Sequence, residues 1–394
     1  PYFRRSSMTF LQHYLPGQAQ EKNGQASMGL QTSYQVSPND NNQIWFGADV
    51  EWADMWVEEV QTNALGSPDN VRFQGQHYDF EVKSQQIAVF VNSEWKRSDR
   101  LTLEAGVRFE SLRYDYQNNM IDGSTRDDGS LCNSGDGSCR YYRPSDQTNS
   151  TDNLNYQLGA HYVFNDDLGG FIRIANAYRA PQINELYRLQ KEQETSVIEA
   201  EQLDSLETGM RYQKQQWLAE LSIYSMKKNQ VIVKDSDSFV VNDGKTNHKG
   251  IELQLAYQLN SAWQLASSAT WAKHQYKYTR LFGGNDIDGN DVDTAPRWQG
   301  GAQALYQPTE RTSIELEWVY LGKYFLDPQN AHQYAGHNVF NLRAQQRYGD
   351  LQINGQITNL TDRRIADRAD YGFGSYRYFV GEGRGFSLEL KRLF

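Results

Sequence analysis

Hydrophobic and polar residues alternate with a period of two along most of the chain. Residues 251–259 read Ile-Glu-Leu-Gln-Leu-Ala-Tyr-Gln-Leu, with apolar side chains at odd positions and mostly polar ones at even positions. The same alternation recurs in residues 101–109, 312–321 and 351–357. Because successive side chains of a strand point to opposite faces of a sheet, each segment has one apolar and one polar face. The pattern predicts an all-β protein.

Sixteen segments carry this pattern, and the connections between them alternate in length. The predicted strands are residues 2–14, 24–36, 43–61, 77–96, 100–116, 152–164, 169–179, 202–213, 216–232, 246–259, 262–278, 295–308, 311–326, 336–348, 350–361 and 383–394. Short links such as 214–215 and 349 alternate with long ones such as 117–151 and 180–201. An antiparallel up-and-down sheet with short turns at one rim and long loops at the other is typical of a transmembrane β-barrel.

Strand length separates this interpretation from a soluble β-sandwich or propeller, which also has amphipathic strands. Many predicted strands are roughly 12 to 18 residues long, whereas strands of globular sheets most often have about 5 or 6. About 9 to 11 tilted residues cross a bilayer, so the surplus would extend above it. Trp52 and Trp271 lie near predicted strand ends, where interfacial aromatic side chains settle. These features favour the membrane barrel.

Composition excludes two other classes. The 394 residues are only 38% hydrophobic, and no apolar run approaches the roughly 18 residues that a transmembrane helix needs. The net charge of -10 comes without a clustered basic patch, which argues against nucleic acid as a partner. Cys132 and Cys139 lie in a stretch rich in Gly, Ser, Asn and Asp, and their spacing is compatible with a disulfide. A disulfide implies an oxidising compartment such as the periplasm or cell surface, whereas two unpaired loop thiols are the alternative.

Two motifs narrow the class. Residues 172–187, IRIANAYRAPQINELY, resemble a strand-and-loop segment of TonB-dependent outer-membrane receptors, and residues 354–364, NGQITNLTDRR, are similar to the segment before the family's last external loop. The family also ends on an aromatic residue. The residues that carry the resemblance are Tyr178, Arg179, Ala180, Pro181, Asn359, Leu360, Thr361, Asp362 and Phe394. Pro181 cannot donate to a ladder and is expected to end strand 169–179, and Asn359 and Asp362 are expected to form a strand-to-loop turn.

The resemblance implies a 22-stranded barrel with an N-terminal plug in its lumen, integral to the bacterial outer membrane. Residues 1–394 are then one partial barrel domain, about 16 of those strands, without the plug and the first strands. A complete sixteen-stranded porin is the rival interpretation. In that case residues 2–14 would close a smaller barrel against residues 383–394, whereas in the receptor interpretation residues 383–394 pair with a strand outside this chain.

The resemblance also implies active import of a scarce ligand, for which we expect a ferric siderophore. The TonB-ExbB-ExbD system would act through the plug, and outer-membrane lipid and lipopolysaccharide would surround the barrel. Passive diffusion, adhesion, and import of haem or another nutrient are the alternatives. Residues 180–201 contain no His for a haem, although His332 and His337 lie in another long connection.

Arg and aromatic residues concentrate in the last long connection, residues 362–382. Guanidinium groups bind carboxylates and catecholates and stack on rings, which suits an anionic aromatic ligand. The expected ligand-binding residues are Tyr187, Arg188, Arg363, Arg364, Arg368, Tyr371, Phe373, Tyr376, Arg377 and Tyr378. The alternative is an ordinary rim, where Arg meets lipopolysaccharide phosphates and rings lie at the interface.

No catalytic motif of the HExxH, GxSxG or CxxC kind occurs, so we expect neither an enzyme nor a resident cofactor. One acidic loop is a candidate calcium site: Asp286, Asp288, Asp291 and Asp293 lie within residues 283–293. Carboxylate oxygens in a Gly-containing loop suit Ca²⁺. This loop lacks the EF-hand spacing and its closing Glu, and a solvated acidic loop is the favoured alternative.

Overall fold

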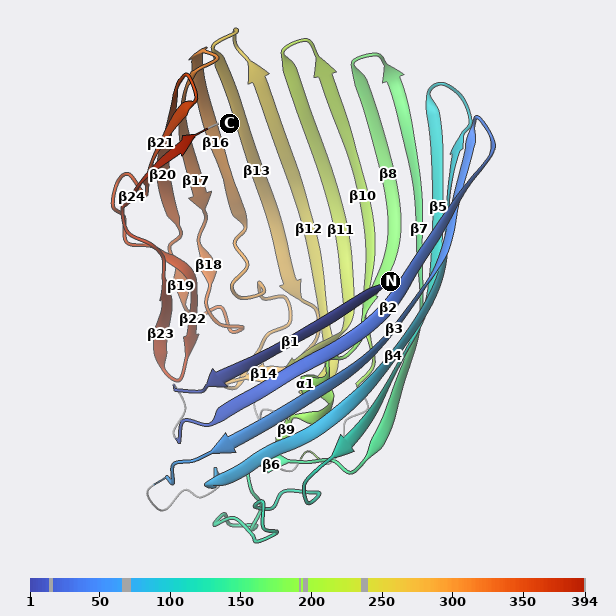
Figure 1. The fold of residues 1–394 in the computed structure, drawn as a ribbon, viewed down its shortest axis with the longest axis vertical. Helices are drawn as coiled ribbons and strands as arrows, with labels where there is room; N and C mark the ends of the chain where they lie inside the picture. Colours follow the sequence, from blue (N-terminus) through green and yellow to red (C-terminus); the bar gives the residue numbers. More distant parts are fainter. Residues whose placement is uncertain (14–16, 66–71, 191–192, 194–197, 235–239, 393–394) are drawn as a thin grey trace.

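The computed structural model describes residues 1–13, 17–65, 72–190, 193, 198–234 and 240–392. Sixteen strands form one antiparallel sheet in chain order (Figure 1). They are β1 Tyr2–Leu11, β2 Gln20–Asn39, β3 Asn42–Gln61, β4 Gly75–Lys96, β5 Leu101–Asn118, β7 Gln147–Asn165, β8 Leu168–Arg179, β10 Glu201–Lys214, β11 Trp217–Lys234, β12 Val240–Gln258, β13 Trp263–Tyr276, β16 Trp298–Thr309, β17 Thr312–Leu321, β20 His337–Tyr348, β21 Leu351–Thr358 and β24 Gly385–Arg392. The all-β antiparallel class is confirmed, and each predicted strand overlaps one of these strands.

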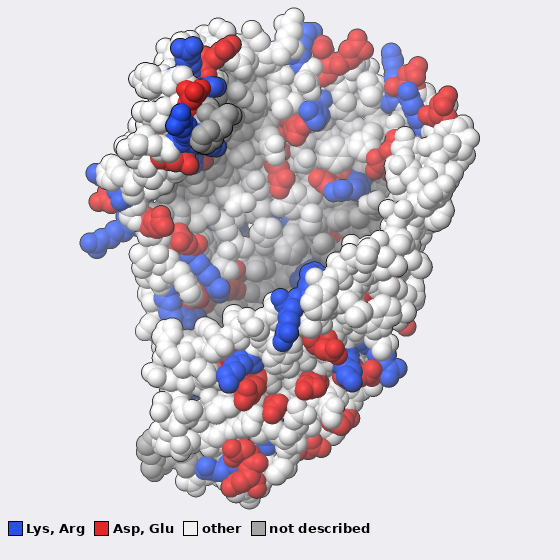
Figure 2. Space-filling view, in the orientation of Figure 1, with Lys and Arg blue, Asp and Glu red and all other residues white. Residues whose placement is uncertain are grey.

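The register gives the sheet an apolar face and a polar face. Val89, Phe109 and Leu154 lie side by side on β4, β5 and β7, and all three are exposed apolar residues. One residue away on β5, Arg108 points to the opposite face, where it pairs with Asp49 of β3. The sheet curls around a hollow, with charged side chains gathered near both of its edges (Figure 2). Alternation along the strands thus separates the two faces as the sequence predicts.

Short turns lie along one edge of the sheet, at the top of Figure 1, and long connections lie along the other. The long connections contain structure that the sequence pattern does not predict. Their elements are α1 Ile183–Tyr187 and the two-stranded ladders β6 Tyr141–Tyr142 with β9 Leu189–Gln190, β14 Leu281–Phe282 with β15 Asn285–Asp286, β18 Tyr324–Phe325 with β19 Gln333–Tyr334, and β22 Ala366–Gly372 with β23 Ser375–Val380. We call this side the loop edge.

The large sheet is open. β1 and β24 are its two end strands, and among the described residues they do not pair with each other. The alternative in which residues 2–14 close a smaller barrel against residues 383–394 is therefore wrong for this structure. The predicted strand 311–326 is also too long, because β17 ends at Leu321 and Tyr324 belongs to the separate β18–β19 ladder.

The buried apolar residues gather at the loop edge rather than midway along the strands. One cluster joins β3, β4 and β5 to the segment around α1, with Phe80, Tyr116 and Tyr187 among its members. A second joins the β18 and β22 segments through Leu326 and Ala369. A single curved layer around a hollow has no second layer to pack against, so loops that fold onto it supply the core. No helix in the described part of the chain is long and apolar enough to cross a membrane.

Candidate ligand-binding site

Arg179 anchors the segment that follows β8. Its guanidinium donates to both carboxylate oxygens of Glu185, at 2.9 and 3.0 Å, and from Nε to Oε2 of Glu201 at 2.8 Å. Glu185 in turn accepts the backbone N–H of Gln182 at 2.7 Å and so caps the start of α1. β8 ends at Arg179, two residues before Pro181, as predicted. The motif residues therefore hold a loop in place.

Glu201 accepts two further hydrogen bonds, from the Lys228 ammonium at 2.6 Å and from the Ile232 backbone N–H at 2.9 Å. Burial acts to raise the pKa of Glu201, but the hydrogen bonds from Arg179, Lys228 and Ile232 outweigh it and lower the pKa to about 2. The carboxylate consequently stays charged across the whole physiological range and ties β8, β10 and β11 together.

Tyr187 and Arg188 are expected to contact ligand, but both are engaged within the chain. The buried Tyr187 ring stacks on Tyr116 with centroids 4.2 Å apart, and its hydroxyl donates to Asn149 Oδ1 at 2.8 Å. Arg188 donates to Glu21 Oε2 at 2.8 Å and to Glu59 Oε2. These two residues fasten the α1 segment to the sheet, and we do not retain them in the ligand site.

The carboxylate of Glu59 is the centre of a buried group that we call the Arg188 cluster: Glu21, Glu59, His77 and Arg188. His77 Nδ1 lies 2.9 Å from Glu59 Oε1, and Gln12 Nε2 donates to Glu59 Oε2 at 3.0 Å. Burial acts to raise the pKa of Glu59, but His77, Arg188 and Gln12 together lower it. The cluster joins β2, β3 and β4 to a residue far along the chain, which sequence spacing could not indicate.

The β22–β23 hairpin contains most of the other expected ligand residues. Asp370 binds two of its cations, Arg377 and, at 3.6 Å, Arg368. The Tyr371 ring stacks on His332 with centroids 3.5 Å apart. Asp327 holds His332 in place: its Oδ2 lies 2.6 Å from His332 Nδ1. The hairpin is thus braced by the β18–β19 segment.

Beyond these braces the hairpin presents an exposed aromatic surface. Phe373 is 99% exposed at the turn, and its ring lies 5.7 Å from the Arg377 guanidinium. Tyr376 and Tyr378 stack in parallel with centroids 6.3 Å apart, and both are about half exposed. The structure brings Tyr371, Phe373, Tyr376, Arg377 and Tyr378 together with Arg368 on one hairpin.

Arg363 and Arg364 belong to the turn that precedes this hairpin, and both are exposed. Asn359 organises the turn: its Oδ1 accepts the Arg363 backbone N–H at 3.0 Å, and its Nδ2 donates to the Arg363 carbonyl at 2.8 Å. Asp362 Oδ1 accepts the Arg384 backbone N–H at 3.0 Å. The predicted strand-to-loop turn at Asn359 and Asp362 is confirmed; Leu360 and Thr361 complete it, whereas Phe394 lies outside the described residues.

The four Asp residues of the candidate calcium loop do not converge. Asp286 accepts backbone N–H groups of its own loop, Asp291 forms a two-pronged ion pair with Arg297 at 2.8 and 2.9 Å, and Asp293 accepts the Tyr276 hydroxyl at 2.5 Å. No group of three metal-ligating side chains occurs among the described residues. Asp286, Asp291 and Asp293 thus each have a separate structural partner.

Cys132 and Cys139 form a disulfide with an S–S distance of 1.97 Å. Both are buried in the apolar cluster at the loop edge. The bridge thus braces the long connection between β5 and β7.

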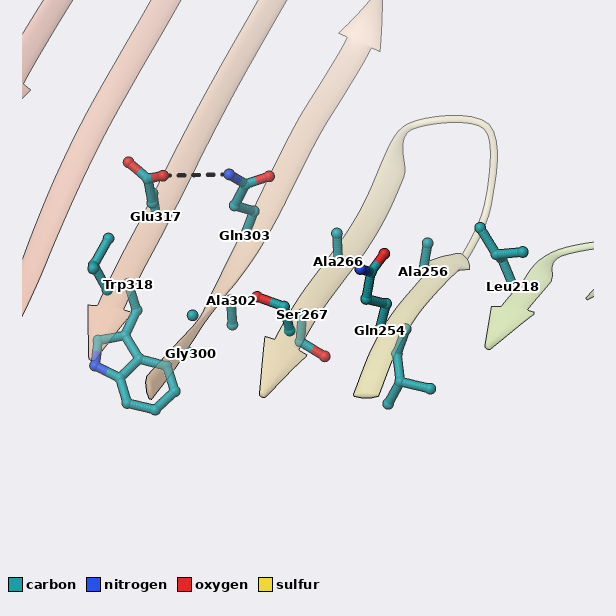
Figure 3. A pocket seen from close by; sticks show the side chains of 14 residues that line it. Leu218, Gln254, Ala256, Ala266, Ser267, Gly300, Ala302, Gln303, Glu317 and Trp318 are labelled. Carbon is teal, nitrogen blue, oxygen red and sulfur yellow. Dashed lines mark hydrogen bonds between the residues drawn. The ribbon is translucent and has the colours of Figure 1, made fainter. Parts of the chain in front are cut away.

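The sheet itself has a shallow depression of about 470 Å³ between β11 and β17 (Figure 3). Small residues such as Ala266, Gly300 and Ala302 line it, and at one side the Gln303 amide of β16 donates to Glu317 of β17 at 3.3 Å. A Cβ atom at Gly300 or Gly301 would lie 2.4 or 2.6 Å from a backbone oxygen of the neighbouring strand. Glycine therefore permits this close approach of the neighbouring strands.

Comparison with known proteins identifies the family. The family model described as "TonB dependent receptor-like, beta-barrel" matches residues 2–360. The chain belongs to the TonB-dependent receptor family. An uncharacterized TonB-dependent receptor of Haemophilus influenzae is 30% identical over 127 residues, which are 30% of this chain and 34% of that protein.

Several solved TonB-dependent-receptor-like structures share the fold. The copper transporter OprC superposes with a TM-score of 0.77 at 14% identity, covering all of this chain and 61% of that one. The ferric yersiniabactin uptake receptor FyuA of Yersinia pestis gives 0.71 at 16% identity, and the ferric citrate transporter FecA gives 0.72 at 15%. Each of these two comparisons covers 95% of this chain and 55% of the solved one. The chain therefore spans about half the length of such receptors, which are not enzymes.

Proposed function

We propose that this chain is the barrel portion of an outer-membrane receptor that binds a ferric siderophore at the loop edge and imports it by TonB-coupled active transport. The exposed surface of the β22–β23 hairpin carries the proposal. Phe373, Tyr376 and Tyr378 offer apolar contact, and the exposed Arg364 of the preceding turn offers a planar cation. Rings and guanidinium groups together suit a ligand that is both anionic and aromatic.

The separation of the two faces supports the membrane part of the proposal. The exposed apolar rows would face outer-membrane lipid and lipopolysaccharide, and the polar face with its ion pairs would line an aqueous lumen. Further strands, to a total of 22, would pair with β1 and β24, and a plug would occupy the hollow and connect to the TonB-ExbB-ExbD system. Residues 1–394 would then be one barrel domain.

Haem is a weaker candidate ligand for this site. His332 would be the axial ligand in this region, but its Nδ1 is bound to Asp327, and its ring stacks on Tyr371 and meets Tyr376 edge-to-face. Coordination would require these contacts to break. A bound Ca²⁺ would likewise have to displace Arg297 from Asp291.

The binding test uses the full-length receptor and its ferric siderophore, followed by quenching of intrinsic fluorescence. We expect Arg364→Ala and Tyr376→Ala each to weaken binding at least tenfold. Arg211→Ala is the matched control, because Arg211 lies near the short-turn edge and pairs with Glu220 at 3.2 Å. Equal affinity in all variants would place the site elsewhere.

Energy coupling has a separate test. Uptake of iron-labelled siderophore by cells should stop when a protonophore collapses the proton gradient, while binding to the cell surface remains. Continued uptake under these conditions would identify a passive pore instead.

A further inference from the structure

Two histidines face each other across the β12–β13 ladder. His248 and His274 are direct register partners, and their Nδ1 atoms lie 2.7 Å apart. The second ring nitrogen of His248, Nε2, lies 2.8 Å from the hydroxyl of Thr246, which is buried. The proposed siderophore site, on the β22–β23 hairpin, uses neither histidine.

The pair lies on the polar face of the sheet. Ile251 and Trp271 are also register partners, and Ile251 belongs to the exposed apolar face together with Ile223 of β11. His248 is three residues from Ile251, and side chains alternate along a strand, so His248 and His274 point the other way, toward the hollow. The imidazoles can therefore be reached from the aqueous side.

We propose that His248 and His274 form a binding site for Cu²⁺ on the inner wall. Imidazole nitrogen is a preferred ligand of copper. The two residues are direct cross-strand partners, so their rings can turn to point both Nδ1 atoms at one metal ion. Sites of this kind bind Cu²⁺ more tightly than Zn²⁺, and a square arrangement of nitrogen and oxygen ligands is typical of Cu²⁺.

The hydrogen bonds of the two histidines are compatible with replacing their shared proton by a metal ion. In the metal-free pair one Nδ1 carries the proton that the other accepts. On binding, that imidazole moves its proton through solvent to Nε2, so both Nδ1 lone pairs become available and the charge of the protein does not change. With Nδ1 on the metal, the Nε2–H of His248 would donate to the Thr246 hydroxyl 2.8 Å away, the kind of second contact that orients metal-bound histidines.

Charges around the pair are balanced. Lys228 interacts electrostatically with His248, but the Lys228 ammonium is paired with the Glu201 carboxylate at 2.6 Å. Asp291 interacts electrostatically with His274, and the Asp291 carboxylate is paired with Arg297. The remaining corners of the square are left to water or to an incoming ligand. The site is independent of the proposed siderophore binding, because it lies on different strands.

The test is titration of the full-length receptor, purified without a histidine tag, with Cu²⁺ in a buffer that does not coordinate the metal, followed by calorimetry and electron paramagnetic resonance. We expect one equivalent to bind with an axial spectrum split by two nitrogens. His248→Gln and His274→Gln should each weaken binding at least tenfold and reduce the splitting to one nitrogen. Thr246→Val should weaken binding about tenfold or more through the lost orienting contact.

His161→Gln is the matched control, because His161 also lies on the polar face but has Glu104 at 3.2 Å rather than a second histidine. It should leave Cu²⁺ binding unchanged. Wild-type binding without nitrogen splitting would overturn the proposal whatever the variants do, and so would equal affinity in the wild type and the His248→Gln/His274→Gln double variant. Siderophore affinity, measured on the same samples, should be unaffected by these substitutions.

Discussion

Replacing Arg188 by Met should open the α1 segment from the sheet. The Glu59 side chain is 2% exposed and that of Glu21 is 8% exposed, while Arg188 itself is 23% exposed. Without the guanidinium, two buried carboxylates would lie close together with no cation from the α1 segment. Removing one partner of a buried ion pair costs about 3 to 5 kcal/mol. At about 1.4 kcal/mol for each factor of ten, the segment should open roughly 100 to 5,000 times more often.

Hydrogen exchange followed by mass spectrometry measures this opening directly. Peptides that cover residues 183–190 of the full-length receptor should lose protection by that factor in Arg188→Met, while peptides from the middle of the sheet keep theirs. The double variant Arg188→Met/Glu59→Gln should lose less, since one of the unpaired buried charges is gone.

Arg173→Met is the control for this experiment. Arg173 pairs with Glu207, but its side chain is 54% exposed, so its removal should cost less than about 1 kcal/mol. If Arg188→Met lowers protection of residues 183–190 no more than Arg173→Met does, the Arg188 cluster does not hold the segment.

Two further predictions concern the charge on Glu201 and the two faces of the sheet. The pKa of Glu201 is lowered to about 2, so the stabilisation by its hydrogen bonds is complete above about pH 4.5 and is lost as the pH falls through about 2. NMR of the Glu201 carboxyl group should show this titration, and Arg179→Gln should raise the pKa. An unchanged pKa in that variant would exclude Arg179 as a cause of the shift. Val91→Arg, on the exposed apolar face, should lower the free energy of unfolding by about 2 to 4 kcal/mol, measured by denaturant unfolding from lipid vesicles. Asn92→Arg, on the other face, should cost much less, and equal costs would contradict the lipid-facing assignment.

The sheet could be predicted from the sequence because its determinants are local. A period of two fixes which residues share a face, and turn lengths fix the order of the strands. The strand ends were less accurate where tertiary contacts extend or interrupt a strand. β12 begins at Val240 rather than at residue 246, and β17 stops at Leu321 because Tyr324 turns away into its own hairpin.

The loop edge could not be predicted in the same way, because its contacts join residues far apart in the chain. Arg188 and Glu59 are separated by 129 positions, and neither has a neighbour in sequence that indicates the other. Resemblance singled out Arg179, but its structural role became visible only with Glu201, which the sequence marked as no more than a residue next to a predicted strand. The ring of His332 against Tyr371 has no sequence signal either.

The contrast between the two edges also determines where the chain can lengthen. About four residues join β4 to β5, and about 28 join β5 to β7. The entropy of closing a loop grows only with the logarithm of its length, so the longer connection costs about 1.7 kcal/mol more than the shorter one. Insertions at the loop edge are therefore thermodynamically inexpensive, and one scaffold can acquire recognition surfaces for different ligands without redesign of its strands.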